Sequence, residues 1–289
     1  IFGDKEFAKE LAGRGYQLSS ANSINIGLLV PQVVYYVYAY AKLLENGEIE
    51  NGEKINVTVP TGNFGNILAA YFAKQMGVPI DKLICASNDN KVLYDFFKTG
   101  VYDKNRPFIL TSSPSMDILI SSNLERLIYL STGCDAEETK KRMEELSKDG
   151  KYSVTGEMRA RMADFVGGYA DQAANAAEIK RLYDETGYMI DTHTGVASCV
   201  YHNYVKETGD TKKTVIASTA SPYKFSRSVM EAIFGSEEGK GEFELIDEME
   251  KASGVKIPQA IEEIRKAEIR HNRQCKPEEM EKTVSDILQ

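Results

Sequence analysis

The chain has 289 residues, of which 42% are hydrophobic and 27% charged, so it is long enough to build a large core. Its formal charge of −8 argues against a nucleic-acid partner, because such binding depends on lysine and arginine facing phosphates. The four cysteines and three histidines show neither a metal-binding spacing nor a disulfide pattern, which predicts no metal and a reducing, cytoplasmic location. No apolar run reaches the roughly 20 residues that span a bilayer, so no membrane partner is expected.

Two helices are expected at the start of the chain. Asp4 can cap the first, which covers Ile1–Ala12 and ends before Gly13. The second extends from about Ser23 to about Leu44, and Asn46-Gly47 ends it. Pro31 lies inside this second segment, so the helix either begins there or kinks.

Strands and helices then alternate, which is typical of a parallel sheet flanked by helices. In such sheets ligands bind at the carboxyl edge of the strands. The strands are predicted over Lys54–Val59, Lys82–Ala86 and Thr214–Ala217, and the helices that follow them over Asn66–Met76, Lys91–Lys98 and Tyr223–Phe234.

The middle of the chain has apolar residues spaced three and four apart, which predicts helices. Asp135 and Asp171 stand at the starts of two of them and are typical N-caps. From Gly235 onward the chain is rich in charge, which predicts surface helices. The middle helices are expected over Met116–Leu130, Asp135–Lys148, Gly156–Val166 and Asp171–Glu185.

A turn with two glycines, Gly62 and Gly65, separates the first predicted strand from its helix. Backbone N–H groups at a helix start lack intrahelical partners, and the helix dipole favours negative charge there. The pattern is neither a nucleotide P-loop nor a dinucleotide fingerprint. It therefore predicts a phosphate site, with a plain strand-to-helix turn as the alternative.

Six motifs, in this order, resemble the C-terminal part of threonine synthase. The resemblance covers the chain from its first residues to about residue 235, and more weakly beyond. The motifs are Ser20-Ala21-Asn22-Ser23-Ile24-Asn25, Pro60-Thr61-Gly62-Asn63-Phe64-Gly65-Asn66, Ser113-Pro114-Ser115-Met116-Asp117-Ile118, Ser121-Ser122-Asn123-Leu124-Glu125-Arg126, Asp191-Thr192-His193-Thr194 and Ser218-Thr219-Ala220.

This resemblance implies the α/β fold of the fold-type II enzymes that use pyridoxal 5′-phosphate (PLP), a fold related to the tryptophan synthase β-subunit, with extra C-terminal helices. All of residues 1–289 would be a C-terminal PLP-binding region, with a core over 1–235 and a charged helical tail over 236–289. The family converts O-phospho-L-homoserine and water to L-threonine and phosphate by β,γ-elimination and hydration. The resemblance also implies a monomer or homodimer whose small-molecule substrate is O-phospho-L-homoserine.

The resemblance also assigns residues to the site. Gly62, Asn63, Phe64, Gly65 and Asn66 are expected to bind PLP, the first three through its phosphate. Thr219 is expected near the pyridine nitrogen, with Ser218 as the next candidate; capping of the following helix is the alternative for both.

Substrate contacts are assigned on weaker grounds, and a structural role is an alternative for each. Helix capping, surface ion pairing and burial are the competing roles. The residues are Ser113, Asp117, Asn123, Arg126 and His193.

Two departures from the family pattern stand out. The lysine that holds PLP as a Schiff base lies in an upstream motif that is absent, and Lys74, Lys82, Lys91 and Lys224 do not lie in its context. Since the first residue is Ile1, the chain is expected to be a C-terminal part that is inactive alone. Leu28 occupies a position where the family has arginine, which is either a lost anion contact or a tolerated structural change.

Three functions remain open at this point. The first is the C-terminal part of threonine synthase itself. The second is a threonine-synthase-like phospho-lyase that acts on a related phosphorylated amino acid. The third is a non-catalytic fragment that binds PLP or phosphate.

Overall fold

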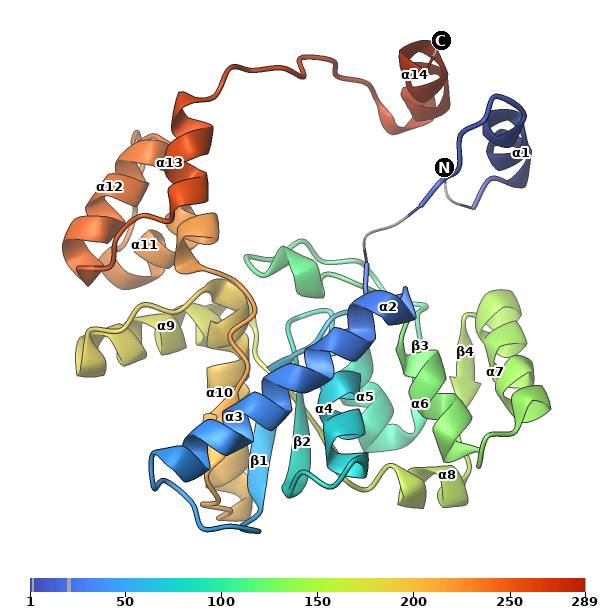
Figure 1. The fold of residues 1–289 in the computed structure, drawn as a ribbon, viewed down its shortest axis with the longest axis vertical. Coiled ribbons are helices and arrows are strands. Elements are labelled where there is room, and N and C mark those ends of the chain that lie inside the picture. The colour runs from blue at the N-terminus through green and yellow to red at the C-terminus, as the bar shows by residue number, and fades with distance from the viewer. Residues whose placement is uncertain (2, 20–21, 289) are drawn as a thin grey trace.

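A parallel sheet forms the centre of the protein in the computed structural model, which describes residues 1, 3–19 and 22–288 (Figure 1). Within these residues the sheet has the strand order β5-β2-β1-β6. Its strands are β1 (Ile55–Pro60), β2 (Ile80–Ser87), β5 (Phe165–Tyr169) and β6 (Thr214–Ile216).

All pairings in this sheet are parallel, so the carboxyl ends of its strands lie at one edge. Val57 of β1 pairs with both Leu83 of β2 and Val215 of β6. Every residue of β1 is buried, including Asn56, which interrupts its apolar and β-branched residues. The expectation that the glycine turn after β1 and the Ser-Thr turn after β6 share the carboxyl edge is confirmed.

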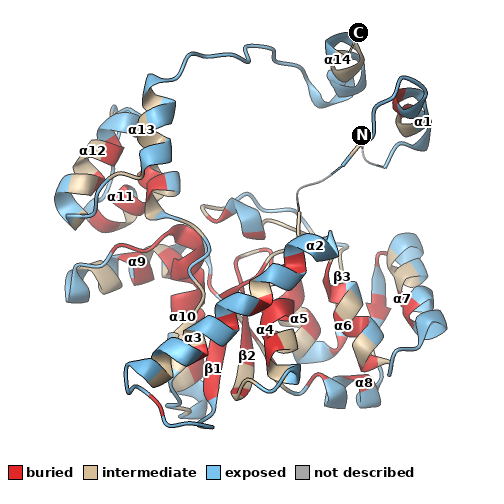
Figure 2. Ribbon diagram, in the orientation of Figure 1, coloured by how far each residue is buried: buried red, intermediate tan, exposed pale blue. Residues whose placement is uncertain are grey.

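Helices cover both faces of the sheet, as Figure 2 shows by the buried residues between the layers. One face packs against α10 (Thr192–Thr208), whose Val196, Ala197 and Val200 contact Ile84 and Ala86. The other face carries α3 (Val33–Glu45), α4 (Gly65–Gln75), α5 (Val92–Thr99) and α6 (Leu124–Ser131).

The remaining elements surround this three-layer core. An antiparallel pair, β3 (Val101–Asp103) and β4 (Lys151–Ser153), lies beside it. The outer helices are α1 (Lys5–Gly13), α2 (Ile26–Leu29), α7 (Ala136–Asp149), α8 (Gly156–Arg161), α9 (Gln172–Thr186), α11 (Ser226–Phe234), α12 (Glu242–Ser253), α13 (Gln259–Lys266) and α14 (Met280–Ile287). Short 3₁₀ turns cover Val30–Gln32, Pro114–Met116, Pro222–Phe225 and Pro277–Glu279.

The predicted helix caps are confirmed. The carboxylates of Asp4, Asp135 and Asp171 accept hydrogen bonds from backbone N–H groups in the first turns of α1, α7 and α9. Pro31 lies in a 3₁₀ turn that joins α2 directly to α3, because its ring cannot donate an α-helical backbone hydrogen bond, and helical structure continues on both sides. Phe2 and the Ser20-Ala21 part of one motif lie outside the described residues.

Two of the predicted middle helices are wrong in extent. Residues 117–123 are not helical, because the Asp117 carboxylate bonds the backbone of Thr111 and the side chain of Asn88 and holds the chain in a loop. The other predicted helix ends at Arg161, and the chain enters the sheet as β5 at Phe165. The structure also adds α10, β3 and β4, which the apolar spacing did not indicate.

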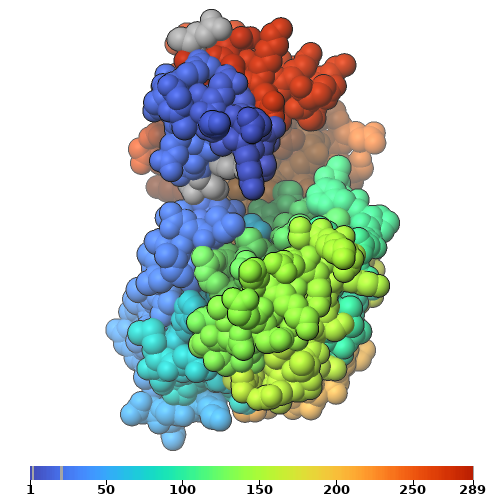
Figure 3. Space-filling model, turned by 90° about the vertical axis from the view of Figure 1, so that its right-hand side faces the viewer, coloured from blue at the N-terminus to red at the C-terminus, as the bar shows by residue number. Residues whose placement is uncertain are grey.

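The C-terminal residues form a second apolar cluster. Helix α12 buries Leu245, Ile246 and Met249 against α11, so the start of the charged segment contributes to a core. Farther on, α14 lies beside α1, where Arg14 donates hydrogen bonds to the carbonyl oxygens of Ser285 (3.2 Å) and Leu288 (2.8 Å). Figure 3 shows these N-terminal and C-terminal parts together at one end of the molecule.

The expectation of no membrane-spanning segment needs a correction. Continuous helix over Ile26–Glu45, 20 residues with mean hydropathy 1.2, is long and apolar enough by length and composition to cross a membrane. Only 22% of this segment is buried, and its outer side is exposed (Figure 2). Helical continuity through Pro31 makes the segment longer than the apolar run read from the sequence.

Candidate functional site

The glycine turn presents a run of backbone N–H groups without acceptors. Thr61 donates its N–H to Ala86 of β2, and helical bonding resumes when Leu68 donates to Phe64. Between them, no described residue accepts a hydrogen bond from the N–H groups of residues 62–66. Since Phe64 and Gly65 are buried, these donors need a partner, and an anion at the start of α4 would supply one.

Phe64 shapes the turn through its backbone. Its φ of 63° and ψ of 2° place it in the left-handed region, which L-residues other than glycine seldom adopt. Its ring is buried 5.6 Å from the ring of Phe165 and 6.1 Å from that of Phe97, centroid to centroid. The ring therefore anchors the turn in the core and leaves only the backbone N–H for a ligand.

One segment, distant in the sequence, holds the carbonyl side of the turn. Ser121 donates its hydroxyl to the Gly62 carbonyl at 2.7 Å. Asn123 donates to the Asn63 carbonyl twice, from its backbone N–H at 3.0 Å and from its side chain at 2.8 Å. Because these carbonyls are bonded, the turn is fixed with its N–H groups still available.

Both glycines are also required by close packing. A Cβ on Gly62 would collide with the carbonyl oxygen of Ser115, and one on Gly65 would collide with the side chain of Ser23. The motif glycines therefore let neighbouring segments approach the turn, as well as leaving the backbone open to a ligand.

Asn66 points from the turn into a cavity of about 640 Å³. The buried Tyr36 phenol donates a short hydrogen bond to the Asn66 amide oxygen, and burial raises the pKa of Tyr36 well above its usual range. The Asn66 amide nitrogen donates to no described residue. Ser218 and Thr219, which are exposed, line the same cavity, together with residues of α3 and β6.

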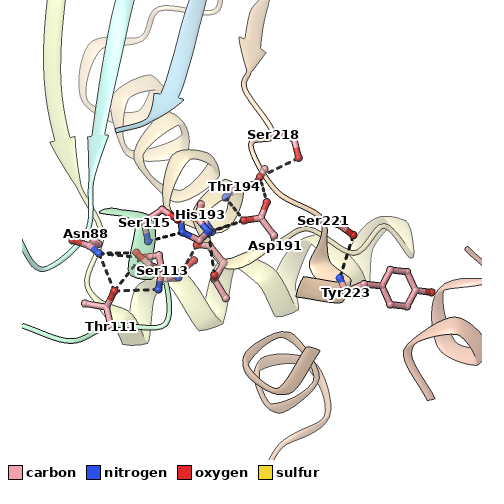
Figure 4. Close-up of polar contacts among 12 residues, drawn as sticks. Asn88, Thr111, Ser113, Ser115, Asp191, His193, Thr194, Ser218, Ser221 and Tyr223 are labelled. Atoms are coloured by element: carbon pink, nitrogen blue, oxygen red, sulfur yellow. Dashed lines mark hydrogen bonds and ion pairs between the residues drawn. The ribbon is translucent and has the colours of Figure 1, made fainter. Parts of the chain in front are cut away.

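A chain of buried polar groups links the Ser-Thr turn to the segment over Gly62 (Figure 4). The Thr194 hydroxyl donates a short hydrogen bond to the Asp191 carboxylate, and its oxygen lies 3.2 Å from the Ser218 hydroxyl, which can donate to it. His193 Nδ1 lies 3.0 Å from Asp191, and His193 Nε2 accepts the Ser115 backbone N–H at 3.2 Å. These contacts assign a neutral imidazole with its proton on Nδ1, because Nε2 is an acceptor.

Asp191 stays ionised in this buried position. Burial alone would raise its pKa, but hydrogen bonds from His193 and Thr194 outweigh burial and lower that pKa. The carboxylate also caps α10 by accepting the backbone N–H groups of His193 and Thr194. His193 is thus a buried residue that positions the Ser115 segment from the start of α10.

Ser113 and Asp117 belong to a network that closes their loop, and Figure 4 labels three of its members, Asn88, Thr111 and Ser113. The amide nitrogen of buried Asn88 has two N–H groups and lies within hydrogen-bonding distance of three oxygens, 2.7 Å from Asp117, 2.8 Å from Thr111 and 3.0 Å from Ser113 Oγ. Asp117 also accepts from the Asn90 side chain at 3.0 Å. Most of the polar groups of these residues are therefore occupied within the protein.

Arg126 supports the turn indirectly, because it contacts Asn123 and Asn123 contacts Asn63. It donates a short hydrogen bond to the Asn123 amide oxygen, and another to the Ile24 carbonyl at 2.8 Å. The sequence assigned both Arg126 and Asn123 to substrate. The structure places Asn123 directly against Asn63, and Arg126 behind Asn123.

Tyr36, Ser121 and Ser23 are residues at the site that the sequence did not single out. Tyr36 lies in none of the quoted motifs, and Ser121 and Ser23 lie inside motifs without an assigned role. Tyr36 is 30 residues from Asn66 in the sequence, and Ser121 is 59 residues from Gly62. No local sequence pattern indicates contacts between residues so far apart.

No lysine lines this cavity among the described residues. Lys74 pairs with Asp164 at 2.9 Å, and Lys82 donates to the Ala163 carbonyl at 3.0 Å. Lys91 lies 4.2 Å from the centroid of the Tyr169 ring, and Lys224 lies 5.5 Å from that of Phe225. Each of these lysines thus has another contact.

Comparison with known proteins gives a consistent family. The family model "Threonine synthase, C-terminal" matches residues 194–284, a range that crosses residue 235. "Threonine synthase-like 1" of Homo sapiens is 43% identical over 236 residues, covering 81% of this chain and 31% of that protein. "Threonine synthase" of Saccharomyces cerevisiae is 35% identical over 272 residues, covering 89% of this chain and 51% of that protein.

Solved structures agree with these relatives. The threonine synthase from yeast superposes with a TM-score of 0.73 at 34% identity, over 89% of this chain and 52% of that one. The PLP-bound threonine synthase from Brucella melitensis gives a TM-score of 0.71 at 34% identity, over 88% of this chain and 55% of that one. The parallel sheet flanked by helices is thus the fold-type II architecture, as expected.

This chain spans about half the length of the threonine synthases that it matches. Within that half, the match covers the glycine turn, the Ser-Thr turn and the sheet that brings them together. The chain is therefore similar to the C-terminal part of the threonine synthases over nearly nine-tenths of its own length, and its residues 194–284 match the model of that C-terminal region.

Proposed function

We propose that this chain forms the PLP-binding part of a threonine synthase, which converts O-phospho-L-homoserine and water to L-threonine and phosphate. The observation that carries the proposal is the run of unpartnered N–H groups over residues 62–66 at the start of α4. The relative from Brucella melitensis, whose structure is described as PLP bound, supports the choice of cofactor.

The residues at the site fit PLP. Several N–H groups at a helix start match a phosphate in charge and in hydrogen bonding. The adjoining cavity of about 640 Å³ can hold a pyridine ring, since pockets for small ligands measure about 300–1,000 Å³. It places the Asn66 amide and the Thr219 hydroxyl on the lining where a ring would lie.

When bound, PLP supplies an electron sink for the reacting carbons of an amino acid, and the protein supplies position and charge. The N–H groups of residues 62–66 would hold its phosphate. Asn66 would donate its amide N–H to the ring substituents, with Tyr36 fixing the amide orientation. Thr219 would lie beside the ring nitrogen, where its neutral hydroxyl would not favour a proton as an aspartate would.

His193 and Asp191 would act through the segment over the turn. Their hydrogen bonds keep Ser115 against Gly62 and so close one side of the phosphate site. Because no described lysine lines the cavity, we expect the chain alone to bind PLP without turning substrate over.

Cofactor binding by the chain as it stands tests the proposal. Equilibrium dialysis should give a PLP affinity that is on the order of 100-fold tighter than that for pyridoxal, because loss of two charge-assisted hydrogen bonds removes about 2.7 kcal/mol or more. Equal affinities for the two compounds would overturn the phosphate assignment.

Two variants locate the site in the same assay. Asn66→Ala should weaken PLP binding by about fivefold to tenfold, as expected for one lost hydrogen bond. Asn63→Ala should also weaken it. Asn272→Ala, an exposed asparagine far along the chain, is the matched control and should leave the affinity unchanged.

A second candidate function has support from the comparisons. The "Threonine synthase-like 1" of Homo sapiens is 43% identical to this chain, and the yeast threonine synthase is 35% identical. That difference favours a threonine-synthase-like phospho-lyase acting on a related phosphorylated amino acid. Phosphate release by a full-length protein of this type, measured with O-phospho-L-homoserine and with shorter phosphorylated hydroxy-amino acids, separates the two.

A further inference from the structure

A second cavity, of about 510 Å³, lies between α6 and α7 and is called the α6–α7 cavity below. Its volume falls within the range of about 300–1,000 Å³ that is typical of small-ligand pockets. Among the described residues it shares no lining residue with the cavity beside Asn66, so the two are separate sites. Figure 1 shows α6 and α7 beside each other, to the right of the sheet.

Both helices turn one continuous face toward this cavity. On each helix the lining residues recur at positions i, i+3, i+4 and i+7, a spacing that places side chains on one face. The lining residues from α6 and the turn before it are Ser122, Glu125, Arg126 and Tyr129. Those from α7 are Ala136, Thr139, Lys140 and Met143.

The charged residues of the cavity lack charged partners. Neither Glu125 nor Lys140 forms an ion pair or a side-chain hydrogen bond with a described residue. Arg126 donates to two neutral oxygens, those of the Asn123 amide and the Ile24 carbonyl, and a guanidinium has further N–H donors. Two cations and one carboxylate therefore line one cavity without being neutralised, in a chain whose formal charge is −8.

The rest of the lining supplies apolar surface. Ala136 and Met143 of α7 line the cavity together with Ile24, which precedes α2 and is 51% exposed. Tyr129 adds an aromatic ring, which is 39% exposed. The α6–α7 cavity thus combines two positive charges, one negative charge and an apolar wall.

We propose that the α6–α7 cavity binds a free α-amino acid with an apolar side chain. Arg126 and Lys140 would hold its carboxylate, since a guanidinium can donate two parallel hydrogen bonds to a carboxylate. Glu125 would pair with its ammonium group, and its side chain would lie against Ile24 and Met143. A simple anion would leave Glu125 unpaired, and a simple cation would leave Arg126 and Lys140 unpaired, so a zwitterion fits better than either.

Arg126 also connects this cavity to the glycine turn. It bonds the Asn123 amide oxygen, and the Asn123 amide nitrogen in turn holds the Asn63 carbonyl at 2.8 Å. A carboxylate bound to Arg126 would fix the guanidinium and, through it, Asn123. A bound amino acid should then tighten PLP binding by about fivefold, and PLP should tighten amino-acid binding by the same factor. This coupling rests on the proposed function, whereas the amino-acid site does not.

Calorimetric titration of the chain without PLP tests the site, with L-leucine as the probe. L-Leucinamide lacks the carboxylate, and 4-methylpentanoate lacks the ammonium group. Each should bind more weakly than L-leucine, on the order of tenfold, because one charged partner in the cavity stays unpaired. Absence of L-leucine binding, or equal affinities for the three compounds, would overturn the proposal.

Two neutral variants locate the site. Lys140→Gln and Glu125→Gln should each weaken L-leucine binding by about fivefold to tenfold, and both side chains are exposed, so the fold should persist. Lys148→Gln and Glu144→Gln are the matched controls, because these exposed residues of α7 do not line the cavity. An unchanged affinity in Lys140→Gln or Glu125→Gln would overturn the assigned contacts.

The dipeptide glycyl-L-leucine distinguishes a free amino acid from the C-terminus of a peptide. It keeps the carboxylate and the side chain but moves the ammonium group away from Glu125. Binding as tight as that of L-leucine would identify a peptide C-terminus as the occupant and overturn the proposal.

Dialysis of PLP with and without saturating L-leucine tests the coupling. Unchanged PLP affinity would overturn the coupling and leave the amino-acid site standing. A chain that binds L-leucine but no PLP would instead contradict the proposed function.

Discussion

The two edges of the central sheet differ in whether their polar groups have hydrogen-bond partners within the protein. At the amino edge, Asp210 accepts hydrogen bonds from the Asn56 side chain at 3.0 Å, the Tyr204 phenol at 2.8 Å and the Lys212 backbone at 3.1 Å. At the carboxyl edge, the N–H groups of residues 62–66 have no described acceptor. The first edge uses its polar groups for stability, and the second leaves its donors free for the ligand that we propose.

The amino edge should be the more costly to disrupt. Asp210→Ala removes the acceptor of the fully buried Asn56 amide and of the Tyr204 hydroxyl. Leaving buried donors unpaired should lower the free energy of unfolding by about 2–3 kcal/mol, measured by urea denaturation. PLP affinity should remain unchanged in the folded fraction; a parallel loss of affinity would show that the edges are not independent.

Gly62→Ala tests whether the carboxyl edge is closely packed as well as open to a ligand. The new Cβ would collide with the Ser115 carbonyl, so we expect about 1–3 kcal/mol of destabilisation together with weaker PLP binding. Gly156→Ala is the control, because a Cβ there meets nothing within 4 Å. Wild-type stability and affinity in Gly62→Ala would contradict the described contact.

Lowering the pH should progressively reduce the stability that Asp210 contributes at the amino edge of the sheet. Burial alone would raise the pKa of Asp210, but hydrogen bonds from Asn56, Lys212 and Tyr204 outweigh burial and hold that pKa well below its usual range. A depressed carboxylate pKa stabilises the fold above the unfolded-state value of about 3.9, and this stability is lost as pH falls through the folded-state pKa.

The stability difference between wild type and Asp210→Asn should therefore be largest near neutral pH and shrink below about pH 4. Urea denaturation at a series of pH values measures it. A difference that stays constant down to the lowest accessible pH would contradict the assigned shift.

Tyr36→Phe should have a smaller effect confined to the site. The change keeps the buried ring and removes only the hydroxyl that holds the Asn66 amide. We expect a loss of about 1 kcal/mol in stability and a fewfold loss in PLP affinity. Tyr40→Phe is the control, since Tyr40 donates to the Glu53 carbonyl away from the cavity.

The smallest effect is expected at Leu28, which belongs to neither edge. Leu28 is 44% exposed on the outer helix side and does not line the cavity. Leu28→Arg should change the free energy of unfolding by less than about 0.5 kcal/mol, as surface substitutions usually do. Unchanged PLP affinity in dialysis would place the residue outside the cofactor site; a tighter affinity would show that an arginine there reaches the ligand.

Local chemistry made much of the fold predictable from the sequence. The caps at Asp4, Asp135 and Asp171, the strands around Val57 and Leu83, and the turn that joins β1 to α4 all depend on residues near one another in the chain. Strand β5 was missed because Gly167 and Gly168 weaken its strand pattern.

The supports of the site could not be predicted in the same way. Asn123 reaches Asn63 across 60 residues and Ser23 across 100, and Asn56 reaches Asp210 across 154. Such contacts depend on the tertiary arrangement, which no local pattern encodes. The roles of Asn123 and Arg126 as supports of the turn therefore emerged only with the structure.

The anchored ring of Phe64 has a consequence for how the proposed cofactor would bind. Core packing offsets the strain of its left-handed backbone, so the turn holds its shape before any ligand arrives. A receptor that is already ordered loses little conformational entropy on association. Capture of the phosphate should then be limited by diffusion and desolvation, with no folding of the loop required.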